Sequence, residues 1–216
     1  MIFPVVFVCN ELKYGHTELV HNLGCTLIEI SSGDNEAADA SDFLDAVASF
    51  DPGIVVVDSY KLKVDWESHV RSSIKTLVVI ADLPDVKHSC DFLVDQNLTD
   101  RTVETWSQLA PEAKILVGPR YALLDSRLNE KRRLKFGEKV ANEKILVYFG
   151  GSNVVGILTK TVEALETIST HSAPAYVVAH KQQWQDVLRS IGKPVNWCIH
   201  QEPNSFFIDL MDNASL

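Results

Sequence analysis

The hydrophobic residues of this chain gather in short runs, and the segments between the runs repeat apolar residues at helical spacing. Each run is nearly all apolar and rich in β-branched residues, a pattern typical of strands covered on both faces of a parallel sheet. The pattern predicts strands at Val5–Cys9, Thr26–Ile30, Ile54–Asp58, Leu77–Ile80, Phe92–Val94, Ile115–Val117, Ile145–Phe149, Ala175–Ala179 and Asn196–Ile199.

The segments with helical spacing predict helices at His16–Asn22, Ala40–Ser49, Trp66–Ser73, Thr161–Thr170, Trp184–Ile191 and Ser205–Met211. Asp42 and Thr159 suit the starts of two of these helices, and Gly24 and Gly192 lie where helices are expected to end. Strands that alternate with helices predict right-handed β-α-β crossovers. The sequence therefore favours an α/β fold built on parallel sheets.

A polar, charge-rich interval divides this pattern in two. We expect a Rossmann-like N-terminal lobe over residues 1–124, a connecting segment over 125–142 and a smaller C-terminal lobe over 143–216. Ligands of doubly wound sheets bind outside the carboxyl ends of the strands. A protein with two such lobes is therefore expected to bind its ligand in the cleft between them.

Composition narrows the choice of partner. The net charge of −9 argues against a nucleic-acid backbone or an anionic membrane as the main partner. The four cysteines have no C-x-x-C spacing, so neither a zinc site nor a disulfide framework is indicated, and a reducing cytoplasm is the expected compartment. The apolar N-terminus is too short to span a bilayer and has no signal-peptide features. No metal or cofactor is expected, and the oligomeric state is left open.

The strand predicted at Ile145–Phe149 runs into Gly150-Gly151-Ser152 and then a helical segment. Two glycines let the backbone turn tightly and approach a ligand closely. The free N–H groups at the start of the next helix can then bind a phosphate. The alternative is that this sequence forms only a tight turn between a strand and a helix and binds no ligand.

Polar side chains follow several of the predicted strands. Asp58 and Tyr60 follow one strand, Asp82 follows the next, Asp95 ends a third, and Tyr121 follows a fourth. Such residues at strand ends can bind or act on a ligand. The alternative is that the aspartates cap the turn or helix that comes next.

Two histidines are candidates for chemistry. His16 follows a glycine and is the best isolated general base, because imidazole titrates near neutral pH unaided. The alternative for His16 is an exposed residue at the start of a helix. His88 lies between Asp85 and Asp91, but a single histidine at this spacing does not favour a metal site.

Taken together, these segments resemble the hydrolase family of pseudaminic acid biosynthesis that removes UDP from UDP-2,4-diacetamido-2,4,6-trideoxy-β-L-altropyranose. Five stretches carry the resemblance in order along nearly the whole chain. They are VVVDSYKLKVDWE (Val55–Glu67), VVIADLPDVKHSCDFLVDQN (Val78–Asn97), GPRYALL (Gly118–Leu124), ILVYFGGSN with LTKTVEAL (Ile145–Leu165), and NWCIHQEPNSFFIDLMDNASL (Asn196–Leu216).

The resemblance implies a glycosyltransferase-B fold, here with both lobes incomplete, and a UDP-sugar as the small-molecule ligand. It implies hydrolysis of the glycosidic C–O bond, with water replacing UDP under general-base assistance, and a link to flagellar or surface glycans. It assigns the diphosphate to Gly150, Gly151, Ser152 and Asn153, and the sugar to Asp58, Tyr60, Asp82 and Tyr121.

The chain also departs from the family. The family's catalytic G-x-G-H-x-x-R loop would lie upstream of Met1, and its uridine-binding Glu would lie beyond Leu216. Gly15-His16 matches part of that loop, but Leu19 stands where the arginine is expected, which makes His16 the candidate replacement base. The alternative function is a catalytically inactive remnant or a UDP-sugar-binding module.

Overall fold

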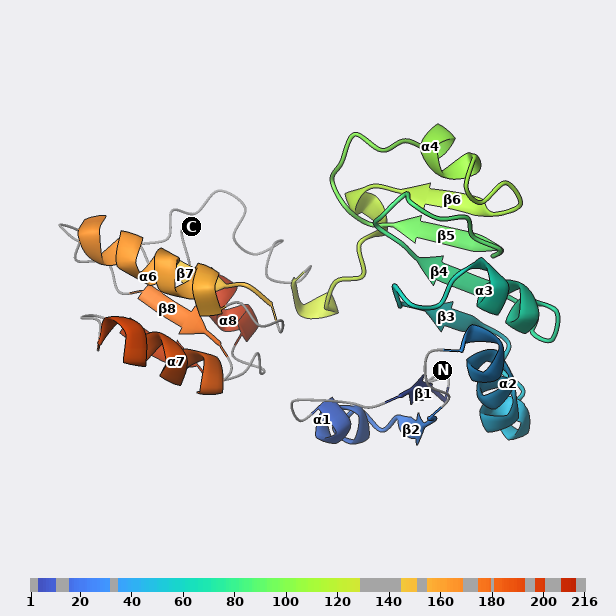
Figure 1. The fold of residues 1–216 in the computed structure, drawn as a ribbon, viewed down its shortest axis with the longest axis horizontal. Coiled ribbons are helices and arrows are strands. Elements are labelled where there is room, and N and C mark those ends of the chain that lie inside the picture. The colour runs from blue at the N-terminus through green and yellow to red at the C-terminus, as the bar shows by residue number, and fades with distance from the viewer. Residues whose placement is uncertain are drawn as a thin grey trace. The chain divides into compact units, whose positions relative to one another are not determined.

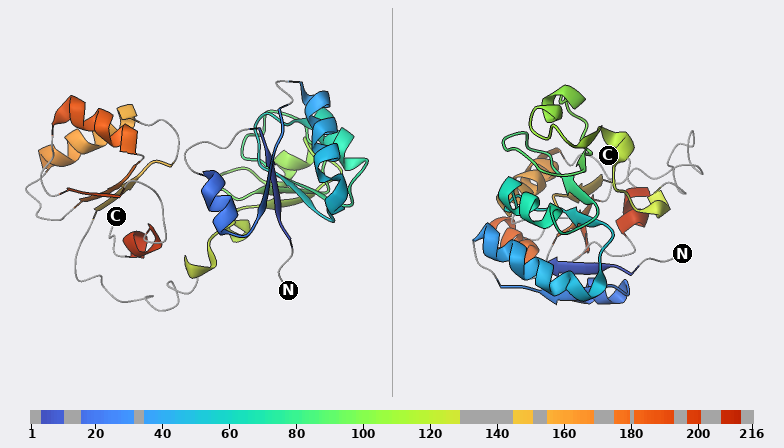
Figure 2. Two further views of the ribbon diagram at one scale, coloured as in Figure 1. Left: turned by 90° about the horizontal axis from the view of Figure 1, so that it is seen from below. Right: turned by 90° about the vertical axis from the view of Figure 1, so that its right-hand side faces the viewer.

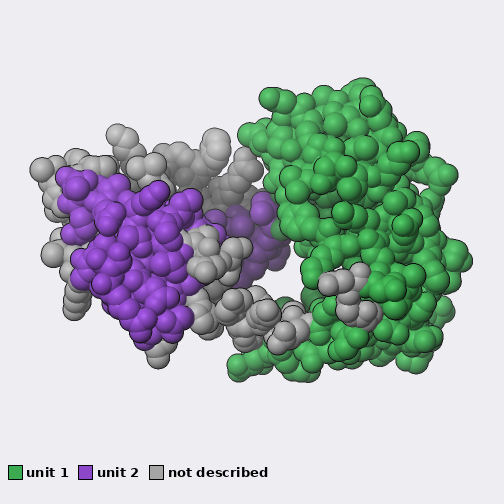
Figure 3. Space-filling view, in the orientation of Figure 1, with its two compact units in different colours: residues 1–123 green, residues 124–216 purple. Residues whose placement is uncertain are grey.

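The computed structural model of the chain describes residues 4–10, 16–31, 35–128, 145–150, 155–168, 175–179, 181–192, 197–200 and 207–212. The chain divides into two compact units, Met1–Leu123 and Leu124–Leu216, which Figure 3 shows in different colours. Both units combine helices with parallel strands, so the chain is an α/β protein, as predicted.

The largest sheet of unit 1 has four parallel strands in the order β3-β4-β5-β6 (Figure 1). These strands span Val55–Val57, Leu77–Ile80, Phe92–Asp95 and Lys114–Val117. Strands β1 (Val6–Cys9) and β2 (Thr26–Glu29) form a separate parallel pair. Because β3 to β6 all run in one direction, their carboxyl ends lie at the same edge of the sheet.

The helices of unit 1 connect these strands. They are α1 (His16–Asn22), α2 (Glu36–Val47), η1 (Ala48–Phe50), α3 (Val64–Arg71), α4 (Val103–Ser107) and η2 (Pro119–Tyr121). Helices α1 and α2 lie on opposite sides of the β1–β2 pair, as the left view of Figure 2 shows. Helices α2 and α3 pack against each other and cover one face of the four-stranded sheet.

The core of unit 1 lies between this sheet and α2 and α3. Trp66 and Val70, which are four residues apart on α3, are both buried and contact the same cluster as Leu77 and Leu93 of the sheet. Residues at this spacing share one face of a helix. The amphipathic pattern of α3 therefore places its apolar face on the sheet.

Unit 2 contains a three-stranded parallel sheet in the order β7-β8-β9. Its elements are β7 (Ile145–Tyr148), α6 (Val155–Ile168), β8 (Ala175–Val178), α7 (Lys181–Ile191), β9 (Trp197–His200) and α8 (Phe207–Asp212). Val147, Val162, Val177 and Val187 form its buried core. The ring of Tyr148, after which the glycine turn begins, lies edge-on to Phe207 at 4.7 Å between centroids.

All nine predicted strands occur, each within one residue of its expected ends. Four helices begin earlier than predicted: α2, α3, α6 and α7. Helix α2 begins at Glu36 because the Asn35 side chain caps it, accepting hydrogen bonds from the N–H groups of Ala37 and Ala38, so Asp42 lies inside the helix. Thr159 likewise lies inside α6.

Gly24 and Gly192 have the positive φ angles, 72° and 76°, that end helices, as expected. Helix α4 was not predicted, because its five residues are too few to display helical periodicity. No helix in the described ranges combines the length and apolar character needed to cross a bilayer.

Candidate functional site

Three polar residues lie at the carboxyl ends of β3 and β4 and line the same cavity. The Tyr60 hydroxyl donates a hydrogen bond to Asp82 Oδ2 at 3.0 Å, and Asp58 lies on the same loop as Tyr60. Together with Ser59, Gln96 and Asn97 they line a cavity of about 190 Å³. The fold therefore brings together Asp58, Tyr60 and Asp82, three of the four residues assigned to the sugar.

One carboxylate oxygen in this cavity accepts no hydrogen bond. Asp82 Oδ1 is buried, and none of the described residues donates to it. Buried polar atoms are almost always hydrogen-bonded, and leaving one unsatisfied costs about 1–3 kcal/mol. The site thus offers a fixed acceptor to a donor from outside the described residues.

The electrostatics of the site keep Tyr60 protonated. Its hydrogen bond to Asp82 raises the pKa of the phenol most, and the negative charges of Asp82 and Asp58 raise the pKa further. Tyr60 therefore stays neutral at physiological pH and holds Asp82 in place as a hydrogen-bond donor. The lone pairs of its oxygen remain able to accept a hydrogen bond.

Asp95 is buried next to the site and does not line the cavity. Its side chain is fully buried, accepts two hydrogen bonds from Arg101 at 2.6 and 3.2 Å, and accepts one from Trp106 Nε1 at 3.0 Å. It also accepts a hydrogen bond from the N–H of Asn97, which fixes the turn that carries this cavity residue. The capping interpretation therefore holds for Asp95. Burial acts to raise the pKa of Asp95, but these hydrogen bonds outweigh it and lower the pKa.

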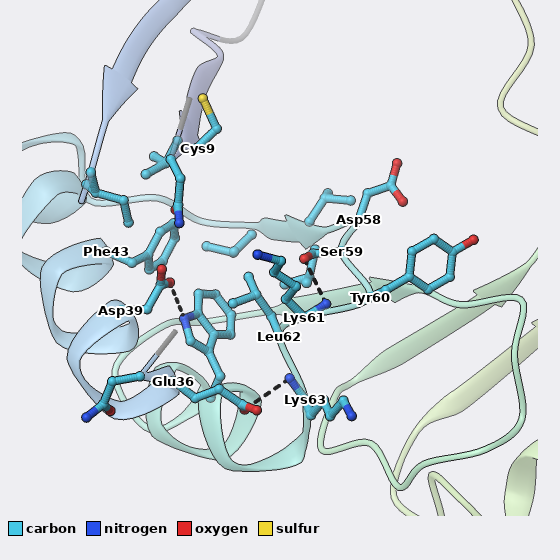
Figure 4. A pocket seen from close by; sticks show the side chains of 18 residues that line it. Cys9, Glu36, Asp39, Phe43, Asp58, Ser59, Tyr60, Lys61, Leu62 and Lys63 are labelled. Atoms are coloured by element: carbon cyan, nitrogen blue, oxygen red, sulfur yellow. Dashed lines mark hydrogen bonds between the residues drawn. The ribbon is translucent and has the colours of Figure 1, made fainter. Parts of the chain in front are cut away.

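A second cavity of about 550 Å³ lies where the β1–β2 pair meets β3 (Figure 4). Its walls include Cys9 and Asn10 at the end of β1, the whole of β3, Phe43 of α2 and Trp66 of α3. Asp58, Ser59 and Tyr60 line both cavities. The two cavities therefore share the loop that follows β3.

Asp39 fixes one wall of the larger cavity. It is 6% exposed, and its Oδ1 accepts a hydrogen bond from Trp66 Nε1 at 2.9 Å. Sequence reasoning missed Asp39 because the helix was expected to begin after it. Asn35 followed by acidic residues at positions 36 and 39 was the signal that could have placed the helix start correctly.

The remaining assigned residues are placed as follows. Tyr121 lies in η2 after β6, is partly buried, and has the Arg120 guanidinium 4.9 Å from its ring centroid; it lines neither cavity. Gly150 follows β7 and has a φ of 80°, a conformation that side-chain-bearing residues rarely adopt. Gly151, Ser152 and Asn153 lie outside the described residues. His16 begins α1, and its side chain is outside the described part of the structure.

His88 has a structural partner that the sequence did not reveal. Its Nδ1 lies 2.7 Å from Oε1 of buried Glu67, whose other oxygen accepts a hydrogen bond from the N–H of Ser89. The pair joins α3 to the segment between β4 and β5. Over the described ranges, no group of three or more His, Cys, Asp or Glu side chains is arranged to hold a metal ion.

Comparison with known proteins assigns no family: no protein-family model matches the chain, and no curated protein matches it. Evidence about function therefore comes from the geometry of the site and from the five stretches of the sequence.

Proposed function

We propose that this chain is a UDP-sugar hydrolase-like protein that binds the sugar at the carboxyl ends of β3 and β4. The observation that carries the proposal is the pairing of Tyr60 with Asp82, whose buried Oδ1 still lacks a donor. Carbohydrate hydroxyl and acetamido N–H groups are donors of the required kind. The carboxyl edge of a parallel sheet is also where α/β proteins bind their ligands.

The size of the smaller cavity supports a sugar in preference to a whole nucleotide. Complete ligand sites usually measure about 300–1,000 Å³. The cavity at Asp82 measures about 190 Å³, which suits one ring of a larger ligand. Gln96 can contribute its amide N–H groups, because its Oε1 already accepts a hydrogen bond from Leu123 N.

The proposed reaction replaces UDP by water at the anomeric carbon. The C–O bond to UDP breaks, the oxygen of water forms the new bond, and a base takes the proton that water loses. The family's own base would lie upstream of Met1, and His16 is the candidate replacement for it. In the same proposal the chain has a glycosyltransferase-B-like fold, supported by the parallel sheets of both units, and the diphosphate lies at the Gly150 turn.

A second candidate is UDP-sugar binding without turnover. Among the described residues that line the two cavities there is no histidine, which favours this candidate. The acceptor at Asp82 serves binding equally well with or without a base nearby.

A calorimetric titration with UDP and with the UDP-sugar named above, combined with an assay for released UDP, tests both candidates. Asp82→Asn is expected to weaken binding of the UDP-sugar about tenfold or more, since a hydrogen bond to a charged group contributes about 1.5–3 kcal/mol. Asp85→Asn removes the same charge from an exposed position of the same loop and is the matched control. Equal affinities for both variants would remove Asp82 from the site.

Turnover separates the two candidates. UDP release that disappears in His16→Ala supports hydrolysis with His16 as the base. Binding of the UDP-sugar without any UDP release supports the binding module. The absence of both binding and release contradicts the proposal as a whole.

The diphosphate assignment has its own test. Gly150→Val is expected to abolish UDP binding, because valine does not adopt the φ of 80° that this turn requires. Gly156→Ala, an exposed glycine in α6 with nothing near the added Cβ, is the control. Unchanged affinity for UDP in Gly150→Val would remove the turn from the site.

A further inference from the structure

The cavity at Asp82 contains two carboxylates and, among the described residues that line it, no cationic side chain. Asp58 follows β3 and Asp82 follows β4. The other described residues of its wall are neutral: Ser59, Tyr60, Ile80, Ala81, Gln96 and Asn97. Two negative charges around a space of about 190 Å³ create a negative potential in that space. The charge of a sugar must therefore affect how tightly this cavity binds it.

Arg101 lies within electrostatic reach of Asp82 but is engaged by another residue. Its Nε and Nη2 atoms both donate hydrogen bonds to buried Asp95, and Arg101 does not line the cavity. The pKa of Arg101 is raised chiefly by its hydrogen bond to Asp95, and the charges of Asp95 and Asp82 add to this rise. Because Arg101 is paired with Asp95, it leaves the charge of Asp82 for a ligand.

Tyr60 responds to the negative potential. The hydrogen bond to Asp82 raises the pKa of its phenol most, and the negative charges of Asp82 and Asp58 raise that pKa further. A further negative charge is therefore unfavourable beside Tyr60, whereas a positive charge is favourable. Tyr60 is 72% exposed and lines the cavity, so its ring can also attract a cation by a cation–π contact. Figure 4 shows Tyr60 and Asp58 on the same loop.

The hydrogen-bonding groups of the cavity favour the same kind of ligand. Asp82 Oδ1 is buried and accepts no hydrogen bond from the described residues, and Asp58 is exposed. An ammonium group has three N–H donors and a positive charge, a hydroxyl group has one donor and no charge, and an ionised carboxylate has no donor. The ammonium group is thus the best match to these acceptors, and the carboxylate is the worst.

We propose that the sugar site at Asp82 selects its ligand by charge: it binds an amino sugar more tightly than the corresponding neutral sugar, and it rejects a sugar that carries a carboxylate. This inference rests on the proposed function, because it concerns the same cavity. A space the size of one ring places every ring substituent within the Debye length, about 8–10 Å, of Asp58 and Asp82. The selection therefore does not depend on which ring position carries the charge.

The probes are UDP-glucosamine, UDP-glucose and UDP-glucuronate, which share the nucleotide and the ring and differ in the charge of one substituent. Each is titrated into the full chain by calorimetry at about pH 6, where amines are ordinarily protonated and carboxylates ionised. EDTA keeps divalent cations off the carboxylates. Affinity is expected to fall from UDP-glucosamine to UDP-glucose to UDP-glucuronate, by about fivefold or more at each step. Equal affinities or the reverse order would overturn the proposal.

Two variants test whether these carboxylates cause the selection. Asp58→Asn and Asp82→Asn each remove one charge at constant size, and each is expected to reduce the ratio of affinities for UDP-glucosamine and UDP-glucuronate by about fivefold or more. Asp85→Asn removes a charge from an exposed residue outside the cavity and is expected to keep the ratio. A purely structural role would weaken the binding of all three probes equally. An unchanged ratio in both Asp58→Asn and Asp82→Asn would overturn the proposal.

Failure of the proposed function gives a different result. If no UDP-sugar binds, the chain is titrated with glucosamine, glucose and glucuronate, and the NMR signal of the Asn97 amide is followed. The same order among the free sugars then supports selection by charge although UDP binding fails. Equal binding of the three UDP-sugars retains the proposed function and overturns the selection. Absence of binding for all of these probes overturns both.

Discussion

The four-stranded sheet and the β1–β2 pair of unit 1 have similar sequence patterns but different surroundings. In the sheet, Leu93 of β5 is fully buried between neighbouring strands and the helices on one face. In the pair, Phe7 of β1 is 45% exposed, although its run is just as apolar. The comparison teaches that an apolar run predicts a strand reliably, whereas its burial depends on which other segments cover it.

The acidic residues of the two regions also differ in their burial. The sheet holds Asp95, which is fully buried and bonded to Arg101 and Trp106. The pair carries Glu29, which is exposed at the end of β2. Buried charges must be satisfied within the protein, whereas exposed charges are satisfied by water.

Asp95→Ala is expected to have the largest effect on stability. It leaves the Arg101 guanidinium and the indole N–H of Trp106 without their shared acceptor, and breaking a buried charge pair costs about 3–5 kcal/mol. Glu29→Ala in β2 is expected to change the free energy of unfolding by less than about 0.5 kcal/mol. Urea denaturation of both variants measures the difference. Similar losses of unfolding free energy in the two variants would mean that Asp95 is not the buried partner of Arg101 and Trp106.

Leu93→Ala and Phe7→Ala compare the apolar residues directly. Leu93→Ala removes a fully buried side chain and is expected to cost about 2–5 kcal/mol. Phe7→Ala is expected to cost less, about 1–1.5 kcal/mol, because much of the ring is already in contact with water. The free energies of unfolding in urea again provide the measurement. A cost for Phe7 as large as that for Leu93 would show that β1 is covered in solution by a segment outside the described residues.

Acid is expected to destabilise the sheet through Asp91 and Asp95. The N–H of Leu77 and the guanidinium of Arg71 lower the pKa of Asp91, and the hydrogen bonds to Asp95 lower its pKa against the effect of burial. Because both pKa values are lower in the folded state, their stabilisation is complete above the unfolded value of about 3.9 and is lost as pH falls below it.

This pH dependence is measured by urea denaturation at a series of pH values from neutral to about 3, where unfolded aspartates are largely protonated. In Asp95→Asn the decline in stability at low pH is expected to be shallower, because one of the two groups no longer titrates. An unchanged slope in Asp95→Asn would contradict the lowered pKa of Asp95.

Much of the fold could be predicted from the sequence, because strands and parallel pairing are encoded in local apolar runs. The start of α2 was misplaced because its Asn35 cap lies several residues ahead of the first recognisable apolar spacing. Contacts between distant residues could not be predicted. The bond from Trp66 to Asp39 and the pair of His88 with Glu67 join residues far apart in sequence, and periodicity carries no information about them.

The candidate site was partly predictable for the same reason. Asp58, Tyr60 and Asp82 were found because each follows a recognisable strand, and the parallel order of β3 and β4 then brings them together. The larger cavity was not predicted, since it depends on how the β1–β2 pair is placed beside β3. Local sequence specifies the strands but leaves their neighbours undetermined.

The smallest expected effect separates the two sides of β3 itself. Val57 is 4% exposed and packs in the core, whereas its neighbour Val56 is 57% exposed. Threonine has nearly the shape of valine, so each Val→Thr change tests only the environment of one methyl group. Val57→Thr buries a hydroxyl and is expected to cost about 1–3 kcal/mol, whereas Val56→Thr is expected to change the free energy of unfolding by less than about 0.5 kcal/mol. Thermal and urea denaturation of the two variants under identical conditions measure both values. A large loss of stability for Val56→Thr would show that this face of β3 is covered.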